Sequence, residues 1–229
     1  MSGQPLPFRP GRLTSNTAFS YACHRCRRCC HDKLIQVNPY EIARLARNRG
    51  ISTGEFIARH LEKEPYLKRQ PDGACVFLGP EGCTVHADRP LVCRVYPLGR
   101  HVTSDGRVEF SQLEGHPQSD GIFGADGTIA DYLANQEVND FVHAADLYLK
   151  QLQRLFDVWQ ESSPANTDEG GSSVTDHAPD DPMPDLLDMD KAVTHYCSKN
   201  SQSEPADLDA RMNLHLLSIE EWLGRQVKK

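Results

Sequence analysis

Cysteine is the residue whose spacing could support chemistry in this chain. Seven of the eight cysteines lie between Cys23 and Cys93, in two groups. The first group is a CxxCxxCC run, Cys23-His-Arg-Cys26-Arg-Arg-Cys29-Cys30. A two-residue gap lets consecutive thiolates turn towards one point, as in zinc sites and in the local cysteine triplet of ferredoxins. The run therefore indicates a cysteine-ligated metal centre whose fourth ligand comes from elsewhere in the chain.

The second group supplies candidates for that remote ligand. Cys75, Cys83 and Cys93 are separated by seven and nine residues, and Arg-Val-Tyr-Pro follows Cys93. Seven thiols exceed the four that one centre needs, so one cluster with spare thiols and two metals with shared ligands both stay open. Soft thiolates suit zinc and iron–sulfur centres alike, and the spacing does not separate them. Cys197 stands alone and is expected to be a free thiol.

These motifs together resemble a known family. The CxxCxxCC run is followed by Cys75-Val-Phe-Leu, Gly82-Cys83-Thr-Val-His, Arg89-Pro90 and Cys93-Arg-Val-Tyr-Pro. Over residues 20–140 this pattern resembles the YkgJ-type cysteine-cluster proteins, whose domain is named for zinc or iron chelation. Flagellin lysine N-methylase carries a similar cysteine domain, and its methyl transfer is associated with an iron–sulfur cluster. The resemblance favours an iron–sulfur cluster of the 4Fe-4S type, with zinc as the alternative.

One position departs from the family pattern. Members often carry another Cys-Pro after the Cys-Arg-x-Tyr-Pro segment, where this chain has His116-Pro117. Histidine ligates zinc and iron, so His116 either replaces a thiolate or is a loop histidine. We expect His24, His31 and His86 to support the site or lie at the surface. The candidate metal ligands are Cys23, Cys26, Cys29, Cys30, Cys75, Cys83, Cys93 and His116.

Two arginines lie close to the second cysteine group. Pro90 fixes the backbone that enters the segment of Cys93, and Arg89 precedes it. A guanidinium group donates several hydrogen bonds in a fixed geometry. We therefore expect Arg89 and Arg94 to donate to loop carbonyls or to a carboxylate.

The charge is distributed unevenly. Residues 1–100 contain 16 Lys/Arg and 8 Asp/Glu, whereas residues 101–229 contain 9 and 24. The basic residues Arg25, Arg27, Arg28, Lys33 and Arg94 lie among the cysteines. We interpret them as compensation for metal-bound thiolates or as solvated helix faces, rather than as a nucleic-acid surface. No apolar run is long enough to span a bilayer, and residues 1–22 do not resemble a secretory signal. A cytoplasmic location is expected, where a dense cysteine set points to metal or redox chemistry.

The sequence predicts an α+β fold that is mainly helical, with a small cysteine-rich, metal-centred domain, short β-hairpins and a longer helical segment. Its expected divisions are an irregular arm at 1–20, a metal-binding domain at 21–160, a flexible linker at 161–185 and a helical segment at 186–229. The last segment is expected to dock on the domain or to bind a protein partner.

Local signals place individual elements. Asn38-Pro39 begins a helix that Gly50 ends, and Ser52 or Thr53 caps the next one. Strands are predicted at 75–78 and 83–85, a second hairpin at 99–110, and one or two amphipathic helices at 128–160.

The leading hypothesis is a metal-binding protein with a cysteine-ligated centre. The alternatives are a zinc-binding structural or interaction protein, a cluster-dependent methyltransferase or redox enzyme, and a protein for metal trafficking or storage. No glycine-rich dinucleotide loop and no nucleophile–base pair stand out in the sequence, so enzymatic activity is left open.

Overall fold

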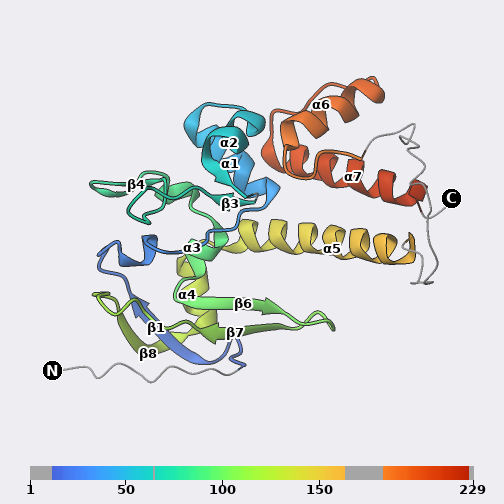
Figure 1. Cartoon of the computed structure of the whole chain (residues 1–229). Helices are drawn as coiled ribbons and strands as arrows, with labels where there is room; N and C mark the ends of the chain where they lie inside the picture. The colour runs from blue at the N-terminus through green and yellow to red at the C-terminus, as the bar shows by residue number, and fades with distance from the viewer. Residues whose placement is uncertain (1–11, 64, 163–182, 227–229) are drawn as a thin grey trace, which may run out of the picture. The chain divides into compact units, whose positions relative to one another are not determined.

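The computed structural model describes residues 12–63, 65–162 and 183–226 (Figure 1). The chain forms two compact units: unit 1 comprises Met1–Val37 and Phe56–Val142, and unit 2 comprises Asn38–Glu55 and His143–Lys229. Most of the predicted linker, and much of the predicted N-terminal arm, lie outside the described residues. The predicted domain boundaries therefore stay predictions.

The predicted α+β class, mainly helical, is confirmed. The α-helices of the described residues are α1 (Pro39–Arg49), α2 (Thr53–His60), α3 (Leu91–Val95), α4 (Ile129–Asn135), α5 (Asn139–Ser162), α6 (Met189–Lys199) and α7 (Leu208–Gln226). The strands are β1 (Ala18–Ala22), β2 (Leu61–Glu62), β3 (Tyr66–Leu67), β4 (Leu78–Gly79), β5 (Gly82–Cys83), β6 (Leu98–Val102), β7 (Val108–Gln112) and β8 (Ile122–Thr128). Among the described helices, none is both long and apolar enough to cross a lipid bilayer.

In unit 1 the strands form four antiparallel pairs rather than one sheet. The pairs are β1–β8, β2–β3, β4–β5 and β6–β7. Strand β1 pairs with β8 from Ala18↔Thr128 to Ala22↔Ile122, with an irregularity between Ala18 and Ser20. One buried core cluster lies among these strands and α4, and it consists of Phe19, Leu98, Phe110, Ile129 and Tyr132.

The hairpin predicted at 99–110 is confirmed as β6–β7. Its turn is closed by hydrogen bonds from the Thr103 N–H to the Arg107 carbonyl and from the Gly106 N–H to the Thr103 carbonyl, both 2.9 Å. Gly106 has φ +80°, a left-handed conformation that glycine adopts without a steric cost.

The strands predicted at 75–78 and 83–85 form the hairpin β4–β5, but the predicted strands are too long. Only Leu78↔Cys83 and Gly79↔Gly82 pair in the ladder. The Leu78 N–H donates to the Cys75 carbonyl at 2.9 Å, so residues 75–78 form a turn. A tight turn cannot continue an extended strand, which is why the ladder is short.

Unit 2 begins with helix α1, which has the boundaries that the sequence signals predict. The Asn38 side chain accepts from the Glu41 N–H, and the Glu41 carboxylate accepts from the Asn38 N–H. This capping box and Pro39 satisfy the first turn, and Gly50 ends the helix at φ +68°. Ser52 caps α2, because its hydroxyl accepts from the Glu55 N–H at 3.2 Å.

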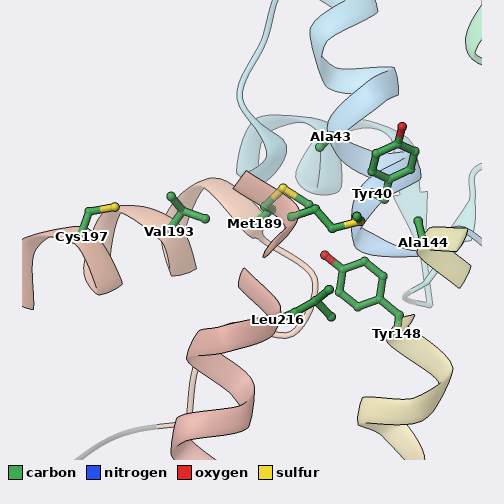
Figure 2. Close-up of a cluster of buried hydrophobic side chains, with 9 residues drawn as sticks. Tyr40, Ala43, Ala144, Tyr148, Met189, Val193, Cys197 and Leu216 are labelled. Atoms are coloured by element: carbon green, nitrogen blue, oxygen red, sulfur yellow. The ribbon is translucent and has the colours of Figure 1, made fainter. Parts of the chain in front are cut away.

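Four helices of unit 2 share one hydrophobic core, shown in Figure 2. Helix α1 contributes Tyr40 and Ala43, α5 contributes Ala144 and Tyr148, and α6 and α7 complete the cluster with Met189, Val193, Cys197, Met212 and Leu216. Cys197 is buried here and is not part of a disulfide, as expected for a free thiol.

Candidate metal centre

The CxxCxxCC run forms a loop with unusual backbone angles. Arg25 and Arg27, on the two sides of Cys26, have φ +54° and +66°. A left-handed conformation costs a non-glycine residue roughly 1–2 kcal/mol, so contacts must hold this loop in place. The Arg27 guanidinium donates to the Pro80 carbonyl, and the Cys30 N–H donates to the Arg27 carbonyl at 3.0 Å. The loop then ends in the 3₁₀ turn Arg28–Cys30.

Backbone hydrogen bonds join the first cysteine group to the second. The Cys75 N–H donates to the Cys30 carbonyl at 2.8 Å, and the Asp32 N–H donates to the Gly73 carbonyl at 3.0 Å. Gly73 has φ +84°, and a side chain there would overlap with the Asp32 carboxylate. The positive φ therefore favours glycine where the two groups meet.

Hydrogen bonding and electrostatic interactions link the thiols of five cysteines. Cys29 and Cys30 share a side-chain hydrogen bond, which raises the pKa of Cys30 and lowers that of Cys29. Burial and the charges of Cys29, Cys93 and Cys75 raise the pKa of Cys30 further. Burial also raises the pKa of Cys75, and the charge of Cys83 adds to this effect. The fold therefore brings cysteine thiols between positions 29 and 93 close to one another.

Two sulfurs accept hydrogen bonds from amides two residues further along the chain. The Cys26 sulfur accepts from the backbone of Arg28, and the Cys75 sulfur accepts from the backbone of Phe77. Burial opposes the effect at Cys26, but the amides of Arg28 and Asp120 and the Ser119 hydroxyl, 3.8 Å from the sulfur, lower its pKa overall. Amide donors favour the thiolate form, which is the form that binds metals.

The seven clustered cysteines are accessible thiols. None of them is in a disulfide; Cys23 is exposed and the other six are half-buried. Within the described residues, no three Cys, His, Asp or Glu side chains surround a common point at which a metal ion would sit. The thiols therefore lie near one another but are not directed at one common point. A set of seven free thiols, two with amide donors, is nevertheless chemically suited to zinc or iron.

His116 lies in a turn next to the first cysteine group. Its Nδ1 accepts from the Gln118 N–H at 3.1 Å, and its carbonyl accepts from the Ser119 N–H at 2.8 Å. Ser119 in turn contacts the Cys26 sulfur, so the turn lies beside the CxxCxxCC loop. Because Nδ1 serves the turn, Nε2 is the nitrogen suited to a metal. The role of His116 as a ligand stays a prediction.

The other three histidines near the cysteines contact protein groups. His24 Nδ1 lies 2.7 Å from the Asp120 carbonyl, and His31 Nδ1 lies 3.3 Å from the Arg27 carbonyl. Burial and the charges of Arg89, Arg25 and Arg94 lower the pKa of His86. His24 and His31 therefore help to hold the loop, and His86 lies in a positive environment.

Arg94 is buried, with 2% of its surface exposed, and it organises the segment around Cys93. Its guanidinium donates to the carbonyls of Arg89 and Gln136, each at 3.0 Å, and to that of Ala87. It also stacks 4.0 Å from the centre of the Phe141 ring. The expected donation to loop carbonyls is confirmed for Arg94, and Arg89 likewise donates to the His86 carbonyl at 2.8 Å.

Sequence reasoning missed a group of tyrosines beside the thiols. The rings of Tyr21 and Tyr96 meet edge to face at 6.0 Å, and the Tyr132 hydroxyl donates to the Tyr96 carbonyl. Burial raises the pKa of Tyr21 to about 12, with added repulsion from Tyr96, Cys23 and Cys29. Burial also raises the pKa of Tyr96 and of Tyr132, so the three phenols are protonated at neutral pH. Only the Tyr in Arg-Val-Tyr-Pro could have signalled this group, because Tyr21 and Tyr132 are far from that motif in sequence.

The cysteine-rich segment also matches a known family model. Residues 22–114 match the CxxCxxCC family. The description of that family is "Putative zinc- or iron-chelating domain". The matched region contains all seven clustered cysteines and ends before His116. No curated protein and no solved structure matches the chain. The CxxCxxCC match supports metal binding, without distinguishing zinc from iron.

Proposed function

We propose that the CxxCxxCC segment of this protein holds an iron–sulfur cluster of the 4Fe-4S type. The observation that supports this proposal is the neighbourhood of Cys30: its thiol shares a hydrogen bond with Cys29, its carbonyl accepts from the Cys75 N–H, and the charges of Cys93 and Cys75 raise its pKa. Four thiolates are the number that such a cluster needs. The further candidates are Cys23, Cys26, Cys83 and His116.

The electrostatics around the thiols are compatible with this role. Four thiolates around a cluster leave excess negative charge, which nearby cations offset. The charge of Lys33 lowers the pKa of Cys29, although the larger influence there is the hydrogen bond with Cys30. Arg25 and Arg28 are exposed in the same loop, and neither has an ion-pair partner among the described residues.

When bound, an iron–sulfur cluster supplies electron transfer or a redox-active centre. The residues of this chain would hold it through thiolates, donate amide hydrogen bonds to two of the sulfurs and place Tyr21 and Tyr96 beside the site. Hydrogen bonds to ligand sulfurs are among the factors that set the potential of a cluster.

The test is elemental analysis with a visible spectrum on protein purified without oxygen. Iron with acid-labile sulfide and a brown colour is expected. Stoichiometric zinc in colourless protein would show that the site is a zinc centre and not an iron–sulfur cluster. Protein without either metal would overturn the proposal that the segment binds metal.

Matched substitutions test the ligand assignment. Cys30→Ser and Cys75→Ser should each abolish retention of the metal, because each removes a thiol from the central group. Cys197→Ser is the control, because that thiol belongs to the core of unit 2. Full metal content in Cys30→Ser or Cys75→Ser would show that the assignment of Cys29, Cys30, Cys75 and Cys93 as the ligands is wrong.

A further inference from the structure

Tyr96 differs from the two other phenols beside the thiols in its hydroxyl group. The Tyr132 hydroxyl donates to the Tyr96 carbonyl, and the Tyr21 hydroxyl shares a hydrogen bond with the Ser119 side chain. The Tyr96 Oη, in contrast, is buried and has no hydrogen-bond partner among the described residues. A buried polar group of this kind is rare in native structures, because it has given up its hydrogen bonds to water. The Tyr96 hydroxyl is therefore suited to a partner that binds later.

The groups that influence this hydroxyl are one hydrogen-bond donor and three thiols. Burial raises the pKa of Tyr96, and the backbone amide of His116 opposes this effect. The thiols that raise the pKa further through their charge are those of Cys29, Cys26 and Cys23. An amide N–H can donate to the phenol oxygen but cannot accept the phenol proton, whereas a thiolate sulfur can accept it. The first cysteine group therefore supplies an acceptor that fits this hydroxyl.

Contacts with neighbouring residues position the Tyr96 ring beside that group. The Tyr21 and Tyr96 rings meet edge to face, with centroids 6.0 Å apart and an angle of 85° between their planes. Tyr21 is confined in turn, because a side chain in place of Gly121 would overlap with its hydroxyl. Ser119, which hydrogen-bonds Tyr21, lies 3.8 Å from the Cys26 sulfur. A chain of contacts thus connects the Tyr96 ring to the CxxCxxCC loop.

We propose that the Tyr96 hydroxyl donates a hydrogen bond to the Cys29 sulfur in the metal-bound protein and thereby raises the reduction potential of the centre. This inference rests on the proposed iron–sulfur cluster. Of the three thiols, Cys23 is exposed and can be solvated by water. The Cys26 sulfur already accepts from two backbone amides and from Ser119. Cys29 is therefore the sulfur that gains most from a further donor.

Metal binding changes the donors that are available to Cys29. In the structure the Cys30 thiol donates to the Cys29 sulfur. A thiol that ligates a metal has lost its proton, so a metal-bound Cys30 has no proton left to donate. The Tyr96 hydroxyl takes the place of that donor, and its own unpaired proton gains an acceptor in the same step.

The expected consequence is an easier reduction of the cluster. Reduction adds negative charge, and a hydrogen bond to a ligand sulfur offsets part of that charge. The reduced form is therefore stabilised more than the oxidised form. Tyr96 acts here as a positioning residue, because it contacts a ligand and tunes the metal centre without being a ligand itself.

Tyr96→Phe in the full-length protein, purified without oxygen, tests the proposal. The variant keeps the ring and removes only the hydroxyl, so its iron and sulfide content should equal that of the wild-type protein. Its cluster should be about tenfold harder to reduce, which is a shift of roughly 59 mV towards lower potential for a one-electron couple. Tyr66→Phe is the matched control, because Tyr66 lies in β3 of the same unit and loses the same hydroxyl.

The outcomes of this titration separate the inference from the proposed function. Equal potentials of Tyr96→Phe and Tyr66→Phe at full iron content would overturn the hydrogen bond and leave the cluster in place. Urea unfolding of both variants provides a further comparison. A purely structural hydroxyl would lower the stability of Tyr96→Phe without changing the potential, and this result would also contradict the proposal.

A second measurement does not depend on which metal the protein holds. Cobalt(II) bound by thiolates has a sulfur-to-metal charge-transfer band, and its energy rises when the sulfur accepts a hydrogen bond. After reconstitution with cobalt(II), this band should lie at longer wavelength in Tyr96→Phe than in the wild-type protein, and Tyr66→Phe should not differ. An unmoved band in Tyr96→Phe would refute the hydrogen bond. A wild-type protein that binds neither iron nor cobalt would overturn the metal centre and this inference together.

Discussion

Different kinds of interaction stabilise the interior of each of the two units. In unit 2, four helices share a nine-residue hydrophobic core, and side chains cap the N-termini of α1 and α6. In unit 1, the cysteine-bearing segments are joined by single backbone hydrogen bonds and two-residue strand pairs. The helical unit is therefore stabilised by its buried core and its caps, whereas the cysteine segments need an additional source of free energy.

Removal of the metal should have the largest effect, and it should destabilise the cysteine segments of unit 1 without destabilising unit 2. Structural zinc contributes roughly 10–16 kcal/mol to folding in small peptides, so loss of the centre should release the segments at 23–33 and 73–95. Hydrogen exchange with peptide-level mass spectrometry should show lost protection there and unchanged protection in α6 and α7. Equal protection of both units after complete metal removal would break the comparison.

Substitution of Arg94 tests whether unit 1 also depends on one buried cation. Arg94→Met should destabilise the protein by about 3–5 kcal/mol, because three carbonyls lose their donor and each loss costs about 1–3 kcal/mol. Urea unfolding measures the change. Arg107→Ala should cost less than about 1 kcal/mol, since its ion pair with Asp105 is exposed. Similar costs for both variants would refute the structural role of Arg94.

Unit 2 should have its own pH dependence through His215. This side chain is fully buried; Nε2–H donates to the Asp185 carbonyl at 2.8 Å, so Nδ1 accepts from the Tyr148 hydroxyl at 3.0 Å. Burial lowers its pKa below 6.5, although the Asp185 hydrogen bond and the charges of Asp185 and Asp188 oppose this. The neutral form is therefore favoured in the folded state, and stability should fall as the pH drops below 6.5.

Hydrogen exchange measures the stability of α6 and α7 at a series of pH values between 7.5 and 5. His215→Gln keeps a polar side chain that does not titrate, so it should flatten the dependence even if it lowers the overall stability. An unchanged slope in His215→Gln would assign the pH dependence to other groups.

The smallest expected effect concerns the start of α1. Asn38→Ala removes the acceptor for the Glu41 N–H and should destabilise unit 2 by about 1 kcal/mol. Asn38→Ser should recover most of that loss, because serine also caps helices. Thermal unfolding followed by circular dichroism is sensitive enough to compare the three proteins. If serine were no better than alanine, the cap would not be what limits α1.

Elements defined by adjacent residues could be predicted from the sequence. The capping box at Asn38, the glycine stop at Gly50 and the β6–β7 turn depend on residues within a few positions of one another. The strand predicted at 75–78 is wrong in its length. Its β-branched and aromatic residues favour extension, but the Leu78 N–H closes a turn on the Cys75 carbonyl, next to the point where the Cys75 N–H donates to the Cys30 carbonyl, 45 positions earlier.

The candidate site shows the same limit. Cysteine types and spacing are local, so the sequence identified the thiols and their chemistry. The contacts that bring Ser119 and Asp120 to Cys26, and Tyr21 beside Tyr96, join residues more than 70 positions apart. One sequence has no signal for such pairs, because they depend on how the chain returns through space.

The division of the chain has a consequence for synthesis on the ribosome. Tyr40 and Ala43 of α1 pack against Met189 and Val193, which lie roughly 150 residues later in the chain. At about 5–20 residues per second, those partners emerge some 8–30 seconds after α1. The cysteine segments, by contrast, are complete once Cys93 has emerged. Metal can therefore be captured by a nascent chain whose α1 still exposes its apolar face, so a chaperone would find its substrate in the helical unit and not in the cysteine cluster.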